Sequence, residues 1–247
     1  MKHTATPAQV SDEQRREALH IPGMAIAVVK DDEVIFVRGF GLSDLELETP
    51  VTPETIFAIG SITKSFTATL AGMLVDEGEM GWDDPVTEYI PYFTLNTKGG
   101  DEGSQVTIRD TLSHQTGFTR MGILIASGTV PREEVLLAAT NAEPWTGLRE
   151  KWYYNNVMYT AAGVAAANAV STDWDALVAE RIFVPLGMTS TNTSVKESQA
   201  DPRLSLGYIW DGDLEVHKHQ PMWVVDGIGP AGAINSNAID MAQWVRF

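Results

Sequence analysis

The sequence of 247 residues contains no cysteine. This absence excludes disulfides, thiol catalysis and cysteine-ligated metals, and it leaves the redox compartment open. Basic residues are scarce, because 17 Lys and Arg stand against 33 Asp and Glu, for a net charge of −16. Such a chain repels phosphate-rich surfaces, so nucleic acid and anionic membranes are excluded as its main partners.

Long hydrophobic runs are also missing, and no stretch approaches membrane-spanning length. Residues 1–7 have no apolar core of the kind found in a secretory signal. We therefore expect a cytoplasmic location, although an upstream segment removed from the chain would leave no trace. The composition itself is globular, since 44% of the residues are hydrophobic and 7 Trp, 6 Tyr and 8 Phe are present.

Hydrophobic patterning predicts a mixed sheet and helix protein. Residues 24–29 and 34–40 predict a β-hairpin around the polar turn 30–33, with Gly39 and Gly41 ending it and a loop over 42–56. An apolar helix is predicted over 61–77, with Gly78 as its stop. Further helices are predicted at 82–91, 106–114, 131–140, 157–170, 174–183 and 239–247, strands at 204–210 and 214–219, and loops at 95–105 and 229–232.

Ser61 and Lys64 stand at the start of the central helix, three residues apart. This spacing places both side chains on one helix face. A serine hydroxyl becomes a nucleophile when a base takes its proton, and a lysine can be that base if burial lowers its pKa. Apolar residues at 59, 62, 66, 70 and 74 indicate a buried helix. A lysine is rarely buried, so its presence there suggests a function. The alternative is an ordinary N-cap serine followed by an exposed lysine.

A second group of candidate residues, Tyr154 and Asn156, lies just before the alanine-rich helix. A phenol can relay a proton between a serine, an amine and a leaving group. The amide of Asn156 can hydrogen-bond a substrate carbonyl or the lysine. Aromatic residues in this position more often belong to a protein core.

Together, Ser61-Ile62-Thr63-Lys64 and Tyr154-Asn155-Asn156 resemble the S-x-x-K and Y-x-N motifs of the serine β-lactamase and penicillin-binding-protein superfamily. The chain is most similar to the β-lactamase-related esterase and peptidase branch, which includes class C β-lactamases. Flanking stretches extend the resemblance from about residue 20 onward, in the same order as in the family. They are residues 21–25, 38–41, 111–117, 185–188 and 230–233.

The resemblance implies an α/β fold of the α+β type, in which a helical lobe is inserted into an antiparallel sheet. It implies a hairpin of the sheet at 20–45, a mainly helical lobe at 46–203, and a second hairpin, loop and helix start at 204–247. Ser61 would be the acylated nucleophile, with its backbone N–H as half of the oxyanion hole. Lys64 would be the base, Tyr154 would protonate the leaving group and later help activate water, and Asn156 would bind substrate. No metal or cofactor is implied, and the partner would be a small ester or amide.

One departure from the family pattern concerns its third motif, K-T-G or H-x-G, on a strand that walls the site. No such motif follows Tyr154, and the remaining strands and final helix of the family are absent from this sequence. The sequence thus resembles a family member cut off near its carboxyl end. Small esters are the expected substrates, with β-lactams or D-amino-acid peptides as alternatives. The competing hypothesis is an inactive fragment or binding protein that keeps the front half of the fold.

Weaker candidates lie elsewhere in the chain. Glu215, His217 and His219 alternate on a strand-like run and could share a metal, but an exposed hairpin explains them better. His114 is expected to be a loop residue that satisfies backbone groups. Three tryptophans, at 145, 152 and 223, could line an apolar acyl pocket, with core packing as the default.

Overall fold

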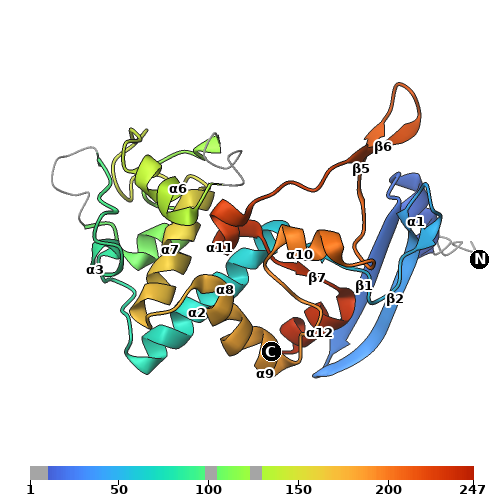
Figure 1. Cartoon of the computed structure of the whole chain (residues 1–247), viewed down its shortest axis with the longest axis horizontal. Helices are drawn as coiled ribbons and strands as arrows, with labels where there is room; N and C mark the ends of the chain where they lie inside the picture. Colours follow the sequence, from blue (N-terminus) through green and yellow to red (C-terminus); the bar gives the residue numbers. More distant parts are fainter. Residues whose placement is uncertain (1–10, 98–104, 123–129) are drawn as a thin grey trace, which may run out of the picture. The chain divides into compact units, whose positions relative to one another are not determined.

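The computed structural model describes residues 11–97, 105–122 and 130–247. The chain forms two compact units, and the second interrupts the first in sequence (Figure 1). The first unit contains residues 1–57, 202–222 and 237–247, and the second contains 58–201 and 223–236. Most of the loop predicted at 95–105 lies outside the described residues.

The first unit is built on an antiparallel sheet of β1 (Gly23–Lys30), β2 (Glu33–Asp44) and β3 (Thr49–Pro50). The predicted hairpin is confirmed, and its two turn residues, Asp31 and Asp32, both have positive φ, as in a type I′ turn. The prediction that glycines end β2 is wrong. A Cβ at Gly39 would lie 2.1 Å from the Val51 carbonyl oxygen, so this glycine allows close strand approach rather than termination.

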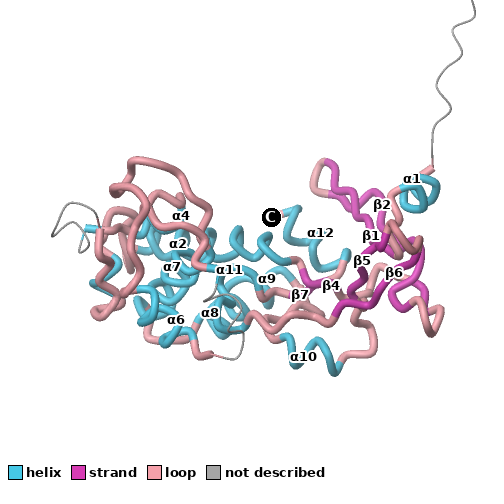
Figure 2. Tube along the Cα trace, turned by 90° about the horizontal axis from the view of Figure 1, so that it is seen from above, coloured by secondary structure: helices cyan, strands magenta, loops and turns pink. Residues whose placement is uncertain are grey.

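The same unit contains two helices and a second hairpin. Helix α1 (Asp12–Ala18) begins with a capping box at Ser11, and α12 (Ala238–Arg246) is capped by Asn237 and packs on β1 and β2. Strands β5 (Gly207–Asp211) and β6 (Val216–Gln220) confirm the hairpin predicted there (Figure 2).

The second unit is mainly helical. Its 3-10 turns are Gly60–Ile62 and Asp226–Ile228, and a π turn spans Ala179–Phe183. Short strands β4 (Phe57–Ala58) and β7 (Asn235–Ser236) pair with each other. The helices are α2 (Thr63–Glu77), α3 (Val86–Tyr89), α4 (Ile108–Leu112), α6 (Arg132–Ala139), α7 (Asn156–Ala169), α8 (Trp174–Val178), α9 (Val184–Leu186), α10 (Val195–Ala200) and α11 (Gly229–Gly232).

The predicted central helix is confirmed as α2, which ends at Gly78 with φ at 80°. The prediction of a loop at 229–232 is wrong, because these residues form the short helix α11 with a proline in its first turn. Helix α10 lies in a segment for which no element was predicted.

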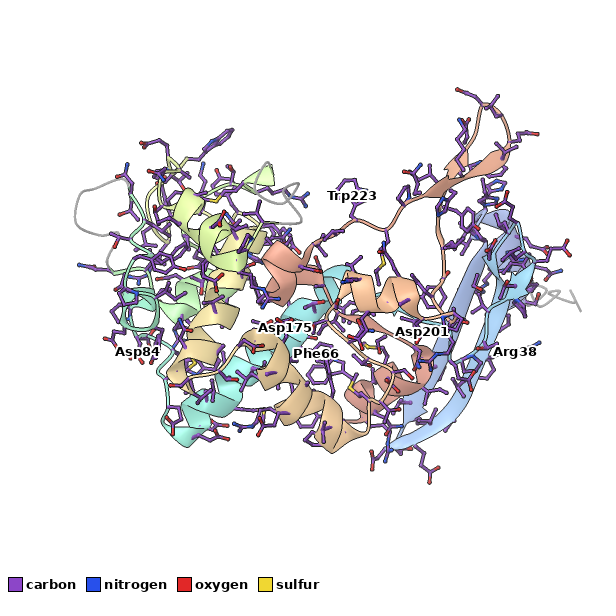
Figure 3. All side chains as sticks on the ribbon, in the orientation of Figure 1. Arg38, Phe66, Asp84, Asp175, Asp201 and Trp223 are labelled. Carbon is purple, nitrogen blue, oxygen red and sulfur yellow. The ribbon has the colours of Figure 1, made fainter. Side chains whose placement is uncertain are left out.

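The core of the helical unit forms where α2 packs on α7 and α11. Phe66, Leu70 and Leu74 of α2 are buried, as predicted, and Figure 3 shows Phe66 inside the unit. The prediction is wrong for Ile62, which is 53% exposed because it lies in the 3-10 turn before α2 and does not continue the buried face. The small side chains of α7 let its neighbours approach closely, and Ala161, Ala162, Ala165 and Ala166 are fully buried.

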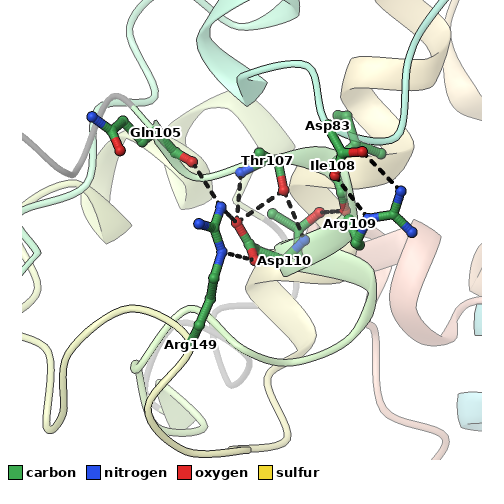
Figure 4. A network of polar contacts seen from close by, with 8 residues as sticks. Asp83, Gln105, Thr107, Ile108, Arg109, Asp110 and Arg149 are labelled. Atoms are coloured by element: carbon green, nitrogen blue, oxygen red, sulfur yellow. Dashed lines mark hydrogen bonds and ion pairs between the residues drawn. The ribbon is translucent and has the colours of Figure 1, made fainter.

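A polar network holds the start of α4 in place (Figure 4). Thr107 caps the helix, and the Asp110 carboxylate accepts a hydrogen bond from the Thr107 backbone N–H at 3.0 Å. Arg149 donates two hydrogen bonds to the same carboxylate, each 2.8 Å long. This network ties the segment before Tyr154 to α4.

Candidate active site

Ser61 is exposed in the 3-10 turn that leads into α2. The preceding residue, Gly60, has φ at +54°, a left-handed conformation that favours glycine. Lys64 lies in the first turn of α2, and its Nζ is 3.2 Å from the Ser61 Oγ. The structure therefore places the two side chains on one face and in contact.

Two further oxygen atoms surround the Lys64 amine. The Asn156 Oδ1 atom and the Ala231 carbonyl oxygen each accept a hydrogen bond from Nζ at 2.7 Å. A neutral amine has two N–H donors and one lone pair. If both donors serve these two oxygens, the lone pair is directed to the remaining neighbour, the Ser61 hydroxyl. This arrangement fits a base that accepts the serine proton.

Burial is the main reason that the pKa of Lys64 is lowered from its ordinary value. The residue is only 7% exposed. Its interaction with the Tyr154 hydroxyl raises the pKa in part, while the positive charge of Arg120 lowers it. The neutral amine is therefore populated at lower pH than in a free lysine.

Tyr154 completes the contacts to the nucleophile. Its hydroxyl donates a hydrogen bond to the Ser61 Oγ at 2.6 Å, and its ring centroid lies 4.7 Å from the Lys64 Nζ. Burial would raise the pKa of this phenol. That effect is outweighed by hydrogen bonds with Lys64 and Ser61 and by the charges of Lys64 and Arg120, so the pKa is lowered. Such a phenol can pass a proton to a departing oxygen.

Asn156 was expected to bind substrate, and in the structure its side-chain oxygen holds Lys64. Because that oxygen is committed to the lysine, the amide NH₂ group is the part that can face a substrate carbonyl. Asn156 is the first residue of α7, and Asn155 caps this helix by accepting a hydrogen bond from the Met158 backbone N–H.

The sequence does not predict that a residue of α11 contacts Lys64. Ala231 offers its main-chain carbonyl to Lys64, and the neighbouring Pro230 carbonyl accepts a hydrogen bond from Thr67 at 2.7 Å. The Trp174 Nε1 atom donates to the same threonine hydroxyl. The sequence gives no sign of this role beyond the resemblance over residues 230–233, because a main-chain carbonyl has no side-chain signal.

His114 lies in the turn after α4 and contacts the backbone on both sides of Tyr154. Burial lowers its pKa to about 4, so the imidazole is neutral at ordinary pH. Its role in satisfying backbone groups matches the expectation for this residue.

The three candidate tryptophans are exposed, so they are not packed in a core as expected by default. Trp145, Trp152 and Trp223 are 68%, 62% and 74% exposed, and Figure 3 shows Trp223 extending away from the ribbon. Trp152 lies near a site residue, because its ring centroid is 6.3 Å from that of Tyr154.

The metal alternative fails on geometry. Residues 215–219 fall in and after the turn of the β5–β6 hairpin, and His217 contacts the His20 carbonyl. Within the described ranges no group of three His, Asp or Glu side chains is arranged to hold a metal ion.

The chain is similar to known proteins over most of its length. The Beta-lactamase family model matches residues 12–247. The unguisins hydrolase of Aspergillus campestris is 30% identical over 241 residues, which is 94% of this chain and 44% of that protein. The chain thus spans less than half the length of this curated relative.

Among the helices that the structure describes, none is long and apolar enough to cross a membrane.

Solved structures give the same result. The octameric penicillin-binding protein homologue from Pyrococcus abyssi superposes with a TM-score of 0.79 at 29% identity, covering 94% of this chain and 53% of that one. D-alanine carboxypeptidase AmpC from Burkholderia cenocepacia superposes with a TM-score of 0.74 at 26% identity, covering 94% and 60%. The fold is therefore of the β-lactamase/transpeptidase type, with helices and antiparallel sheets as predicted.

Proposed function

Because the chain belongs to the Beta-lactamase family, we propose that it is a serine hydrolase that works through a Ser61 acyl-enzyme. The observation that carries the proposal is the contact of one exposed serine oxygen with two proton-transfer groups. The Lys64 amine lies 3.2 Å from that oxygen and the Tyr154 hydroxyl 2.6 Å from it. A nucleophile next to an oriented base is the general arrangement for covalent catalysis.

In the acylation step, the Ser61 Oγ forms a bond to the substrate carbonyl carbon while its proton passes to the Lys64 Nζ. The bond from that carbon to the leaving oxygen then breaks, and Tyr154 gives the leaving oxygen a proton. The Lys64 ammonium restores the phenol proton. Water next attacks the acyl carbon and gives up a proton to Tyr154 and Lys64. The bond from that carbon to the Ser61 Oγ then breaks, the proton passes to the Oγ, and the acid is released.

The substrates proposed are small esters, with β-lactams and D-amino-acid peptides as alternatives. Ser61 is exposed rather than enclosed, and the nearby Trp152 side chain is exposed as well. These two features support a site that is open to small acyl groups with an apolar portion.

The test uses p-nitrophenyl acetate and a fluorescent penicillin, followed by intact mass. We expect a covalent adduct that is lost in Ser61→Ala, together with a fall in ester turnover of about a thousandfold. Ser65→Ala is the matched control, because Ser65 lies about one turn beyond Ser61 and its hydroxyl donates a hydrogen bond to the Ile62 carbonyl. Turnover that survives unchanged in Ser61→Ala would refute the proposal.

The same experiment separates the competing hypothesis of an inactive or penicillin-binding protein. A stoichiometric Ser61 adduct without multiple turnovers would favour a binding protein that acylates and stops. Unmodified protein with every probe would favour the inactive fragment.

A further inference from the structure

A second aromatic ring, that of Tyr159, faces the Lys64 amine besides the ring of Tyr154. The Lys64 Nζ lies over the Tyr159 ring at 5.5 Å from its centroid, and at 4.7 Å from the centroid of the Tyr154 ring. Both distances fall within the roughly 6 Å over which a ring face attracts a cation. Tyr159 has no role in the mechanism above.

Helix α7 holds this ring in place. Tyr159 follows Asn156 by three residues, so both side chains lie on one face of α7. The Asn156 oxygen accepts a hydrogen bond from the lysine at 2.7 Å, and the Tyr159 ring faces the same amine. The His114 ring lies 5.1 Å from the Tyr159 ring between centroids. One face of α7 therefore gives the lysine both an oxygen and an aromatic face.

The pKa values of the two phenols beside Lys64 are shifted in opposite directions. Burial would raise the pKa of Tyr154, but hydrogen bonds with Lys64 and Ser61 and nearby positive charges lower it overall. Burial, followed by the charge of Tyr154, raises the pKa of Tyr159. Opposite shifts in neighbouring titratable groups separate their roles. Tyr154 is suited to carry a proton, whereas Tyr159 stays a neutral ring.

The other groups around the amine do little to stabilise a positive charge on it. Arg120 is a permanent cation and opposes that charge. The His114 imidazole is neutral above its pKa of about 4. Among the residues that the structure describes, no carboxylate lies within hydrogen-bond distance of Nζ. A Lys64 ammonium is therefore balanced by neutral oxygens and by ring faces, not by a carboxylate.

We propose that Tyr159 is a positioning residue whose ring face stabilises the Lys64 ammonium that forms when Ser61 attacks the substrate. The inference rests on the proposed function, in which Lys64 takes the serine proton. A ring face attracts an ammonium through its quadrupole and attracts a neutral amine far less, so the contact strengthens as the positive charge develops. An interaction that strengthens in this way lowers the barrier to acylation.

The test changes the electron density of the ring and keeps its size. Tyr159 is replaced by phenylalanine and by phenylalanines with an increasing number of ring fluorines, because fluorine withdraws electron density from the face that attracts the cation. We expect Tyr159→Phe to keep kcat/KM for p-nitrophenyl acetate within about threefold. Across the fluorinated series the plateau of kcat/KM should fall about tenfold in total, and its acidic limb should move about half a unit to lower pH.

A second readout needs no turnover. The pKa of Lys64 is followed by NMR of the lysine ε-carbon, and its signal is identified by its loss in Lys64→Arg. This pKa should fall across the series together with the acidic limb, because a weaker ring face stabilises the ammonium less. The control places the same series at Tyr92, a ring of the same unit that is 42% exposed. Fluorination there should change neither the rate nor the pKa of Lys64.

Three outcomes would overturn the inference. A loss of turnover in Tyr159→Phe would mean that the hydroxyl, and not the ring face, is required. A plateau and a Lys64 pKa that stay constant across the series would mean that the ring only fills space. Equal changes with the series at Tyr92 would reduce the effect to a general one of fluorination. Absence of Ser61-dependent turnover in the wild type would refute the proposed function and this inference with it, whereas turnover that ignores ring fluorination refutes the inference alone.

Discussion

The His114 imidazole accepts a hydrogen bond at Nδ1 from the buried Asn155 backbone N–H, 3.2 Å away. The His114 carbonyl also accepts one from the Tyr153 backbone N–H at 3.0 Å. These two bonds hold the residues on either side of Tyr154, and the ring centroids of His114 and Tyr154 lie 4.7 Å apart. Since Nδ1 must accept, the imidazole is neutral with its proton on Nε2.

Replacing the imidazole by a ring without an acceptor should therefore cost stability and activity. We expect His114→Phe to lower the free energy of unfolding by about 2 kcal/mol, because the Asn155 N–H is left buried and unpaired. kcat should fall as well, because Tyr154 loses its support. His114→Asn is the control, since asparagine tolerates the left-handed backbone, φ +61°, and offers an acceptor. Urea unfolding that differs by less than about 0.5 kcal/mol between wild type and His114→Phe would contradict this.

The same imidazole predicts how stability depends on pH. Its pKa falls from 6.5 in the unfolded chain to about 4 in the folded protein, mainly because of burial. Between these values the unfolded state binds more protons, so the stabilising contribution is complete above 6.5 and is lost as the pH falls toward 4. Unfolding free energies measured across this window should fall more steeply for wild type than for His114→Phe. Parallel slopes would rule out His114 as the source.

Lys64 predicts the pH dependence of catalysis. Because burial lowers its pKa, kcat/KM should rise with pH to a plateau through an apparent pKa below that of a free lysine. Lys64→Arg places a permanent cation there and should reduce kcat about 10²-fold or more. Lys196→Arg, at an exposed position of α10, should leave the rate unchanged. A flat profile through the mildly acidic range would argue against Lys64 as the base.

Two helix-interior glycines should respond in opposite ways to alanine. A Cβ at Gly163 of α7 would lie 2.4 Å from the Pro230 Cβ, so Gly163→Ala must push α7 and α11 apart. We expect a loss of about 2 kcal/mol in stability, and a lower kcat because the Ala231 carbonyl moves away from Lys64. In α2, a Cβ at Gly72 would meet only Trp82 atoms at 3.8 Å. Gly72→Ala should raise stability by up to about 1 kcal/mol, and the reverse order of the two melting temperatures would contradict this packing.

Two arginine–aspartate pairs lie near α4 (Figure 4). Their carboxylates differ in burial, so the two pairs should differ in their contribution to stability. The Asp110 side chain is 4% exposed, and although burial raises its pKa, hydrogen bonds from Arg149 and Thr107 lower it below the ordinary value. Asp110→Asn should cost about 2 kcal/mol, because it removes charge-assisted hydrogen bonds to a buried carboxylate. Asp83 is 75% exposed beside Arg109, where solvent screens the pair, so Asp83→Asn should cost much less stability than Asp110→Asn. Equal losses in chemical denaturation would show that burial does not set the difference.

The helical and hairpin elements were predictable where local chemistry decides the conformation. The Thr107 cap, the Gly78 stop and the turn at Asp31 and Asp32 each depend on residues within one turn of the chain. Predictions were wrong where packing decides. Local chemistry predicts that Gly39 ends β2, yet this glycine allows the close approach of the segment that follows β3. Ile62 was placed on the buried face, yet a 3-10 turn shifts it outward.

The sequence by itself determined that Ser61 and Lys64 share one helix face, because residues three apart on a helix are neighbours whatever surrounds them. It also determined the family, through motifs in the same order along the chain. The resemblance assigned Tyr154 and Asn156 to the same site, and only the tertiary structure decided which atoms contact this pair and added the Ala231 carbonyl. Tyr154, Asn156 and the Ala231 carbonyl reach the serine and lysine because α2, α7 and α11 pack together on small side chains. The lowered pKa of Lys64 follows from the same packing, since burial is a property of the assembled fold and not of any local sequence.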